Sequence, residues 1–159
     1  MNENTRARLR ELRGHLLRLH KLLLDGEREV YERAHGRVGA GEMLQLLING
    51  ARFAWLRRLS ELIVRADELL DAKKDEPATD ADARAVFSQA RTMLAPAEDG
   101  TDFAENYRAA LQRDPSIVLA HAEVTRVLAA EDRSEPPAAS GRERELRNAE
   151  CGMRIRRGA

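Results

Sequence analysis

Apolar residues recur at helical spacing along most of the chain, and the first stripe is the longest. Its members are Leu9, Leu12, Leu16, Leu19, Leu23 and Val30. Spacings of three, four and seven residues keep side chains on one face of an α-helix. We therefore predict a helix from about residue 5 to residue 35, ended by Gly36 and the glycines that follow it.

A second long stripe predicts a helix over residues 52–72. One side of it carries Phe53, Leu56, Leu59, Ile63, Ala66 and Leu70. Trp55, Leu62 and Leu69 recur at seven-residue spacing and form another apolar line on the same helix. A short apolar segment at 42–48 and a turn at Asn49-Gly50 separate the two long helices.

Three shorter helices are predicted after the polar linker KKDEPATDAD. The first covers about residues 80–94 and is capped by Thr79 or Asp80, because these side chains accept orphan backbone N–H bonds. A second follows Thr101 as its cap. Asp114 and Pro115 then open a third helix, which runs to about residue 130, since proline is tolerated at the first helical position.

These patterns predict an all-α fold: a compact bundle of two long helices and three or four shorter ones. Residues 1–130 are expected to form the bundle domain. Beyond residue 131 the apolar period ends, so we expect a disordered C-terminal tail over 131–159.

The composition agrees with charged, amphipathic helices and limits the classes of binding partner. Of the 159 residues, 43% are hydrophobic and 34% charged, and the 27 basic residues balance the 27 acidic ones. Zero net charge argues against bulk attraction to nucleic acid. The charge is uneven, however: residues 1–24 carry six basic against two acidic residues, and residues 67–105 carry eleven acidic against four basic ones.

The charge of the first residues, the length of the apolar runs and the cysteine content bear on the cellular location. Its N-terminal segment is charged, no apolar run approaches the length of a membrane span, and Cys151 is the single cysteine. One cysteine excludes an intrachain disulfide. We expect a soluble cytoplasmic protein with no membrane partner, and the arginine-rich, lysine-poor composition points to a bacterial source.

Several polar residues lie where the helical period predicts a buried side chain. The test is whether the residues three and four positions away on either side are apolar. His20 has four leucines at these positions, which predicts that it lies within the buried stripe. Glu27 and Arg13 lie one heptad after and before it, so the three should line one inner face.

The same test selects His121, Asp67 and Tyr107 on other predicted helices. Because an unpaired buried charge costs several kcal/mol, such residues need partners in the interior. Two histidines and two carboxylates are the donor types of transition-metal sites, and a carboxylate beside an imidazole is also an acid–base pair.

Two classes of function remain open. The first is an interior site for a small molecule or a divalent transition metal, with hydrolysis among its chemistries. Its catalytic or metal-binding residues would be His20, His121, Glu27 and Asp67, and its substrate contacts Arg13, Tyr107 and Trp55. The second is a non-catalytic module for homodimerisation or protein interaction. There Trp55, Leu62 and Leu69 form part of an oligomer surface, and the inner polar residues specify helix register.

Two segments resemble a known group of sequences. LLRLHKLLLDGEREVYERAHGRV and FAWLRRLSELIVRADELLD are similar to small bacterial helical proteins without an assigned function, over about residues 9–72. The resemblance implies a compact helical fold and a bacterial source. It rests on no catalytic motif, so it implies no activity.

Overall fold

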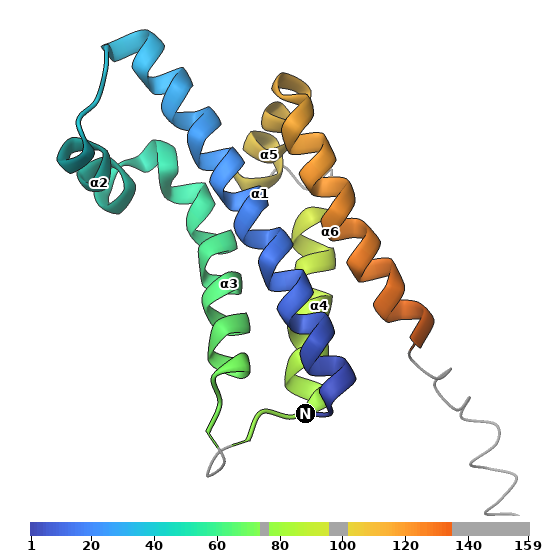
Figure 1. Ribbon diagram of the computed structural model, residues 1–159. Coiled ribbons are helices and arrows are strands. Elements are labelled where there is room, and N and C mark those ends of the chain that lie inside the picture. Colours follow the sequence, from blue (N-terminus) through green and yellow to red (C-terminus); the bar gives the residue numbers. More distant parts are fainter. Residues whose placement is uncertain (74–76, 96–101, 135–159) are drawn as a thin grey trace, which may run out of the picture. The chain divides into compact units, whose positions relative to one another are not determined.

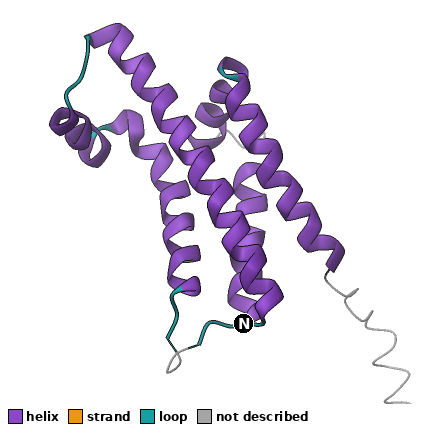
Figure 2. Cartoon of the chain, in the orientation of Figure 1, coloured by secondary structure: helices purple, strands orange, loops and turns teal. Residues whose placement is uncertain are grey.

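The computed structural model describes residues 1–73, 77–95 and 102–134, and every regular element in these ranges is helical (Figures 1 and 2). The all-α prediction is therefore confirmed. The elements are α1 (Glu3–His35), α2 (Ala40–Asn49), the 3₁₀ helix η1 (Ala51–Leu56), α3 (Arg57–Leu70), α4 (Asp80–Leu94), α5 (Asp102–Arg113) and α6 (Pro115–Ser134). The chain divides into two units, Met1–Ala129 and Ala130–Ala159.

The first predicted helix forms almost as expected, as α1. The Asn2 side chain accepts a hydrogen bond from the Thr5 backbone N–H and so caps the first turn. The helix ends at Gly36, whose φ of 86° lies in the region that favours glycine. The five leucines of the apolar stripe, Leu9 to Leu23, are fully buried.

The second predicted helix is divided, which corrects the expectation of one helix over 52–72. Its first five residues, 52–56, belong to η1 together with Ala51, and the α-helix α3 begins only at Arg57. Gly50 permits this tight connection, because a Cβ atom there would lie 2.4 Å from the Leu46 carbonyl oxygen. The short segment before it is helical as α2.

The remaining helices begin and end close to the predicted positions. Thr79 caps α4 in a capping box: its side chain accepts from the Asp82 N–H, and the Asp82 carboxylate accepts from the Thr79 N–H. Helix α6 begins at Pro115 and runs to Ser134, past the predicted end near residue 130. The predicted tail is therefore wrong over residues 131–134, which continue α6. The rest of it, with Cys151, and the predicted Thr101 cap lie outside the described residues.

The core of the first unit is built around α1, α3 and α4, which pack against one another (Figure 1). Helix α3 lies beside α1 and runs antiparallel to it, since Arg13 contacts Asp67 and His20 contacts Ser60. The fully buried side chains at the centre include Leu16, Leu59 and Phe87. None of the described helices is long and apolar enough to cross a membrane.

Candidate functional site

The polar residues predicted to share one interior site belong to four different contacts. These are Arg13 with Asp67, His20 with Ser60, Glu27 with Arg52 and Arg113, and Tyr107 with His121. The two histidines and the two carboxylates were expected to meet one another. In the part of the chain that the structure describes, no hydrogen bond or ion pair joins His20 or His121 to Glu27 or Asp67.

The first two contacts lie along the line where α1 meets α3. The Arg13 Nε atom lies 2.6 Å from the Asp67 Oδ1 atom, and each side chain is more than a third exposed. This ion pair is open to solvent, so it contributes on the order of 0–1 kcal/mol to stability. Its main consequence is geometric: it sets Arg13 of α1 level with Asp67 of α3.

His20 and Ser60 form the second contact, with 2.8 Å between the histidine Nε2 and serine Oγ atoms. His20 is half-buried rather than central in the core, because its neighbour Leu17 is 37% exposed. Burial nevertheless lowers the pKa of His20 below 6.5. The Ser60 hydroxyl also lies 3.3 Å from the Leu56 carbonyl oxygen, to which it can donate while it accepts from His20.

Between these polar pairs lie two exposed apolar side chains. Leu17 is 37% exposed and Val64 is 53% exposed. Each lies three and four residues from the polar residues of its own helix, so it occupies the same helix face as they do. We call the surface formed by Arg13, Leu17, His20, Ser60, Val64 and Asp67 the α1/α3 face.

A serine beside a neutral histidine is also the start of a nucleophilic site, but this pair lacks a key component. Acyl transfer needs N–H or side-chain donors aimed at the developing oxyanion. The 3₁₀ helix η1 runs directly into α3, and the Arg57 N–H donates to the Ala54 carbonyl oxygen. The backbone N–H groups before Ser60 are therefore engaged in helical hydrogen bonds and are not aimed at an oxyanion. The pair therefore fits a structural or binding role better than hydrolysis.

Glu27 is the most buried charged side chain among the described residues, with 5% exposure. Its carboxylate contacts the Arg113 Nη2 atom at 3.0 Å and the Arg52 Nε atom at 3.3 Å. The arginines come from α5 and η1, so this cluster joins three elements. Because a buried carboxylate needs such partners, the contacts account for Glu27 without a ligand.

Tyr107 and His121 meet beside a small cavity between α4, α5 and α6. The Tyr107 hydroxyl oxygen lies 2.8 Å from His121 Nδ1, and Tyr107 is almost fully buried. The cavity has a volume of about 80 Å³ and is also lined by Leu94, Ala104 and Leu111. Burial raises the pKa of Tyr107 and lowers that of His121, so both rings are neutral at pH 7.

Trp55 and Leu62 do not form the predicted oligomer surface. Trp55 is 5% exposed and Leu62 is fully buried, while Leu69 is partly buried. Trp55 packs edge-on against Phe103, with 5.6 Å between ring centroids. The prediction was wrong for Trp55 and Leu62, because seven-residue spacing does not distinguish a core from an oligomer interface.

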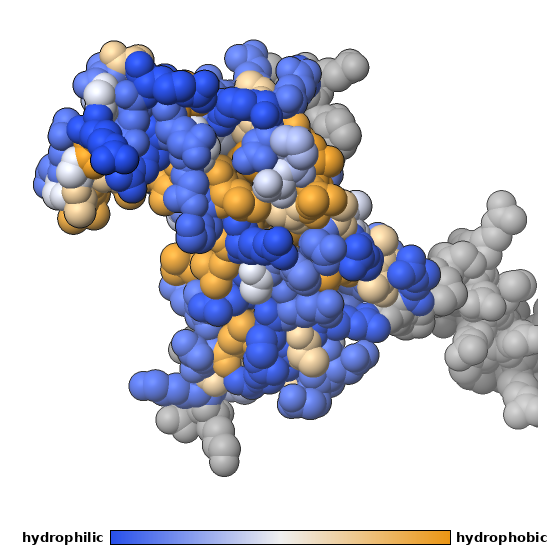
Figure 3. Space-filling model, turned by 45° about the horizontal axis from the view of Figure 1, so that its top comes forward, coloured by the Kyte–Doolittle hydropathy of each residue, from blue (hydrophilic) through white to orange (hydrophobic). Residues whose placement is uncertain are grey.

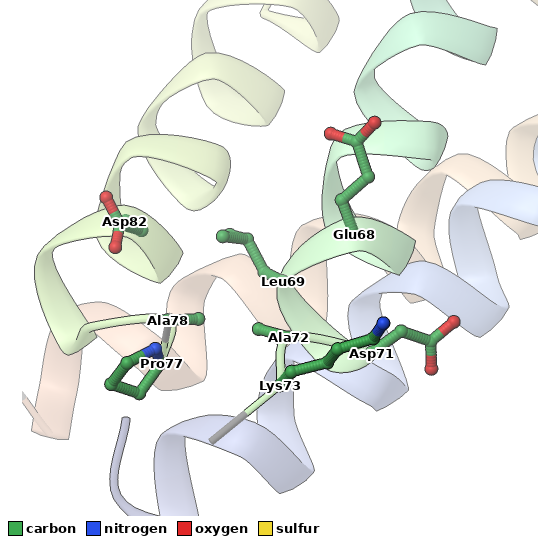
Figure 4. Close-up of a pocket in the computed structure, with 8 residues that line it drawn as sticks. All are labelled: Glu68, Leu69, Asp71, Ala72, Lys73, Pro77, Ala78 and Asp82. Atoms are coloured by element: carbon green, nitrogen blue, oxygen red, sulfur yellow. The ribbon is translucent and has the colours of Figure 1, made fainter. Parts of the chain in front are cut away.

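A larger cavity, of about 620 Å³, lies where α3 ends and α4 begins. Figure 4 shows Leu69 pointing into it, while the carboxylates of Asp82 and Asp71 lie on opposite sides of the space. Asp82 is already used by the capping box. The acidic groups therefore do not converge on a single point in this cavity.

Within the described ranges, no group of three or more histidine, cysteine, aspartate or glutamate side chains is arranged to hold a metal ion. Comparisons of the chain with protein-family models, with curated proteins and with solved structures found no match. The candidate functions therefore depend on the geometry of the described residues.

Ser60, Arg52 and Arg113 were not predicted as site residues. The neighbour test could have found Ser60, because Leu56, Ile63 and Val64 lie at three of its four neighbouring positions. No comparable signal exists for the two arginines. They reach Glu27 from the ends of other elements, and helical periodicity contains no information about such long-range contacts.

Proposed function

We propose that the chain is a non-catalytic interaction module that forms a homodimer through the α1/α3 face. The observation that carries the proposal is the pair of exposed apolar residues, Leu17 and Val64, held between two polar contacts. Figure 3 shows one side of the molecule with apolar patches between hydrophilic side chains. Apolar surface framed by polar groups is typical of protein–protein interfaces.

The antiparallel arrangement of α1 and α3 is compatible with a second copy of the chain related by a two-fold axis. A two-fold axis parallel to these helices would place α1 of one copy over α3 of the other, again antiparallel. Leu17 and Val64 of both copies would then lie at one level and form an apolar layer. The Arg13–Asp67 and His20–Ser60 pairs would form polar layers on either side of it. The result is an up-down four-helix arrangement, a common and stable packing.

The charges on the two helices favour this choice of partner. The exposed α1 residues on the side of Leu17 include the basic Arg10 and Lys21. The exposed residues on the side of Val64 are acidic except for Arg57: they are Glu61 and Glu68 of α3 and Asp71, which follows α3 directly. In the proposed dimer Arg10 comes within about one residue, 1.5 Å, of the level of Asp71. Lys21 comes within about two residues of the level of Glu61. The opposite arrangement, α1 over α1, would bring like charges together.

A glycine in the middle of α1 also suits close contact. Gly14 is exposed, and a Cβ atom there would meet nothing within 4 Å. It lies one helical turn from Leu17, on the side of α1 that faces the proposed partner. A glycine at this position allows a second helix to approach the α1 backbone more closely than a larger residue would.

The expected affinity is modest. Helix α3 has 14 residues and is therefore about 21 Å long. Two helices of that length, each about 10 Å wide, offer a footprint at the low end of specific interfaces. We expect a dissociation constant on the order of 1–100 µM, weaker at high salt because the flanking charge pairs are screened.

The test is the molar mass in solution, measured by light scattering after size exclusion over a wide range of protein concentration. Wild-type protein should reach twice the monomer mass. Leu17→Glu and Val64→Glu should each weaken association at least about 100-fold, since two copies of the charge enter the apolar layer. Leu119→Glu is the matched control, because Leu119 is exposed on α6, outside the α1/α3 face.

A charge exchange tests the arrangement of the copies. Glu61→Lys should weaken the dimer by placing Lys21 opposite a second lysine, and Lys21→Glu in the same chain should restore it. A wild-type protein that stays monomeric at the highest concentration would contradict the proposal, as would a dimer that Leu119→Glu breaks and Leu17→Glu leaves intact.

The proposal keeps two expectations from the sequence. The described helices are taken to form a compact bundle of two long and several shorter helices, and the protein is taken to be cytoplasmic. The lack of a membrane-crossing helix among the described elements supports the location. Nucleic acid is not a proposed partner, because basic α1 and acidic α3 residues lie side by side on the face.

A further inference from the structure

The cavity between α4, α5 and α6 is lined by a hydrogen-bonded pair of polar side chains, Tyr107 and His121. Neutral tyrosine and neutral imidazole carry one polar hydrogen each. The contact between the Tyr107 hydroxyl and His121 Nδ1 uses one of the two. Either the hydroxyl donates and the His121 Nε2–H remains, or Nδ1–H donates and the Tyr107 O–H remains.

When the remaining hydrogen lies on His121 Nε2, its partner among the described residues is the exposed Thr125. Thr125 Oγ1 lies 3.4 Å from His121 Nε2, at the long limit for a hydrogen bond. The Thr125 hydroxyl itself donates to the His121 carbonyl oxygen, at 2.9 Å. Because Tyr107 and His121 both line the cavity, an acceptor bound there could take this hydrogen in place of the long contact with Thr125.

The other walls define what else the ligand must be. Leu94, Ala104 and Leu111 supply apolar surface, and the Arg108 side chain adds a positive charge to the lining. Arg108 favours a carboxylate over a neutral carbonyl as the acceptor. The aliphatic walls favour a short hydrocarbon chain attached to it.

The size of the cavity limits the length of that chain. Its volume is about 80 Å³. A cavity of about 150 Å³ holds benzene, so this one has room for about three to five non-hydrogen atoms. A carboxylate of two or three carbon atoms, with four or five non-hydrogen atoms, is of this size, whereas a medium-chain fatty acid is too long.

We propose that the cavity between α4, α5 and α6 is a binding site for a short-chain aliphatic carboxylate, whose oxygen accepts the hydrogen left over by the Tyr107–His121 pair. The cavity is formed by different helices from the α1/α3 face. The binding site and the proposed dimer can therefore be tested separately, and failure of one does not affect the other.

The probe is propionate, titrated into the full chain while the His121 imidazole and Leu111 methyl signals are followed by nuclear magnetic resonance. Saturable shifts of both signals are expected, with a dissociation constant on the order of 1 mM for so small a ligand. Acetate should bind within about ten-fold of propionate, and octanoate should not compete. Propionamide should bind at least about ten-fold more weakly, because it lacks the charge.

Because either Tyr107 or His121 can supply the hydrogen, substitutions of the two residues should have non-additive effects on propionate binding. Tyr107→Phe leaves the His121 N–H as a donor, and His121→Phe leaves the Tyr107 O–H. Each single variant should therefore bind within about ten-fold of wild type, whereas the double variant should lose binding by far more than the product of the two effects. Propionate binding that survives in the double variant would overturn the proposal, and complete loss in one single variant would overturn the shared donor.

A second pair of variants tests the location without touching the polar pair. Ala104→Leu places extra volume in the cavity and should abolish binding, while Ala109→Leu, an exposed position on the same helix, should not. Both variants should show the wild-type circular dichroism spectrum. Unchanged binding in Ala104→Leu, or no saturable shift in wild type, would contradict the site.

Discussion

His20 and His121 each place a titratable ring partly inside the protein, against neutral hydroxyl partners. His20 contacts Ser60 and His121 contacts Tyr107, and burial lowers both histidine pKa values. Neither pair offers the protonated ring a carboxylate. The folded protein therefore favours neutral imidazole at both positions.

This burial predicts a stability that depends on pH near neutrality. In the unfolded chain both histidines take up protons as the pH falls through about 6.5, before they do so in the folded protein. The free energy of unfolding should therefore fall from pH 7.5 to 5.5, by at most about 1.4 kcal/mol per pH unit for each histidine, and level off below the folded pKa values. Urea unfolding of wild type and of His20→Gln/His121→Gln measures it. A slope unchanged in the double variant would contradict the assignment.

At this scale the neighbour test found residues that face inward, and it did not find their partners. It selected His20, Asp67 and Tyr107, and each of them makes a contact between helices. The test uses only residues three or four positions away, so it reports which face a residue occupies. Which residue of another helix lies opposite depends on how the helices pack, and local spacing contains no measure of that.

Among the elements, α1 contains a glycine that its own helix does not require. Gly14 lies in mid-helix in open space, whereas Gly36 ends the helix with a φ of 86°. Alanine at position 14 removes the conformational freedom of glycine from the unfolded chain. Alanine at position 36 must adopt a backbone conformation that is essentially restricted to glycine.

The two substitutions should therefore have opposite effects. Gly14→Ala should raise the free energy of unfolding of the monomer by about 0.5–1 kcal/mol, and Gly36→Ala should lower it by about 1–3 kcal/mol. Neither added Cβ atom meets a neighbour within 4 Å, so the two changes in unfolding free energy contain no contribution from altered packing. Thermal and urea unfolding at low protein concentration provide the measurement, and effects of the same sign would contradict it.

Element type and approximate bounds were predictable because both depend on nearby residues. Thr79 caps α4 and Pro115 opens α6, as their local chemistry predicts. The division of the second long helix at Leu56 was not predictable in this way. The apolar spacing continues through it, and the tight connection at Gly50 sets where η1 begins.

At the scale of the whole molecule, the all-α class followed from the sequence, but the position of the candidate site did not. The predicted common site separates into contacts between α1 and α3, contacts between α5 and α6, and the Glu27 cluster that joins α1, η1 and α5. The uneven charge of the chain could be interpreted only from the packing, which places the basic first part of α1 beside Asp67, near the end of α3.

The Glu27 cluster has a consequence for the order in which the protein folds. Its hydrogen bond to Arg113 joins residues 86 positions apart in sequence, and Arg52 comes from a third element. Contacts between such distant residues carry a high loop-closure cost, so we expect them to form after the folding transition state. Glu27→Gln should then accelerate unfolding about 10-fold or more and leave the folding rate nearly unchanged.

Stopped-flow folding and unfolding in urea separate these two rates. Asp25→Asn is the control, because its ion pair with Lys21 is local and exposed and should change either rate little. If Glu27→Gln instead slows folding and leaves unfolding unchanged, the cluster belongs to the folding nucleus. If the Glu27 cluster forms after the transition state, it slows unfolding without speeding folding, and it therefore lengthens the lifetime of the native state.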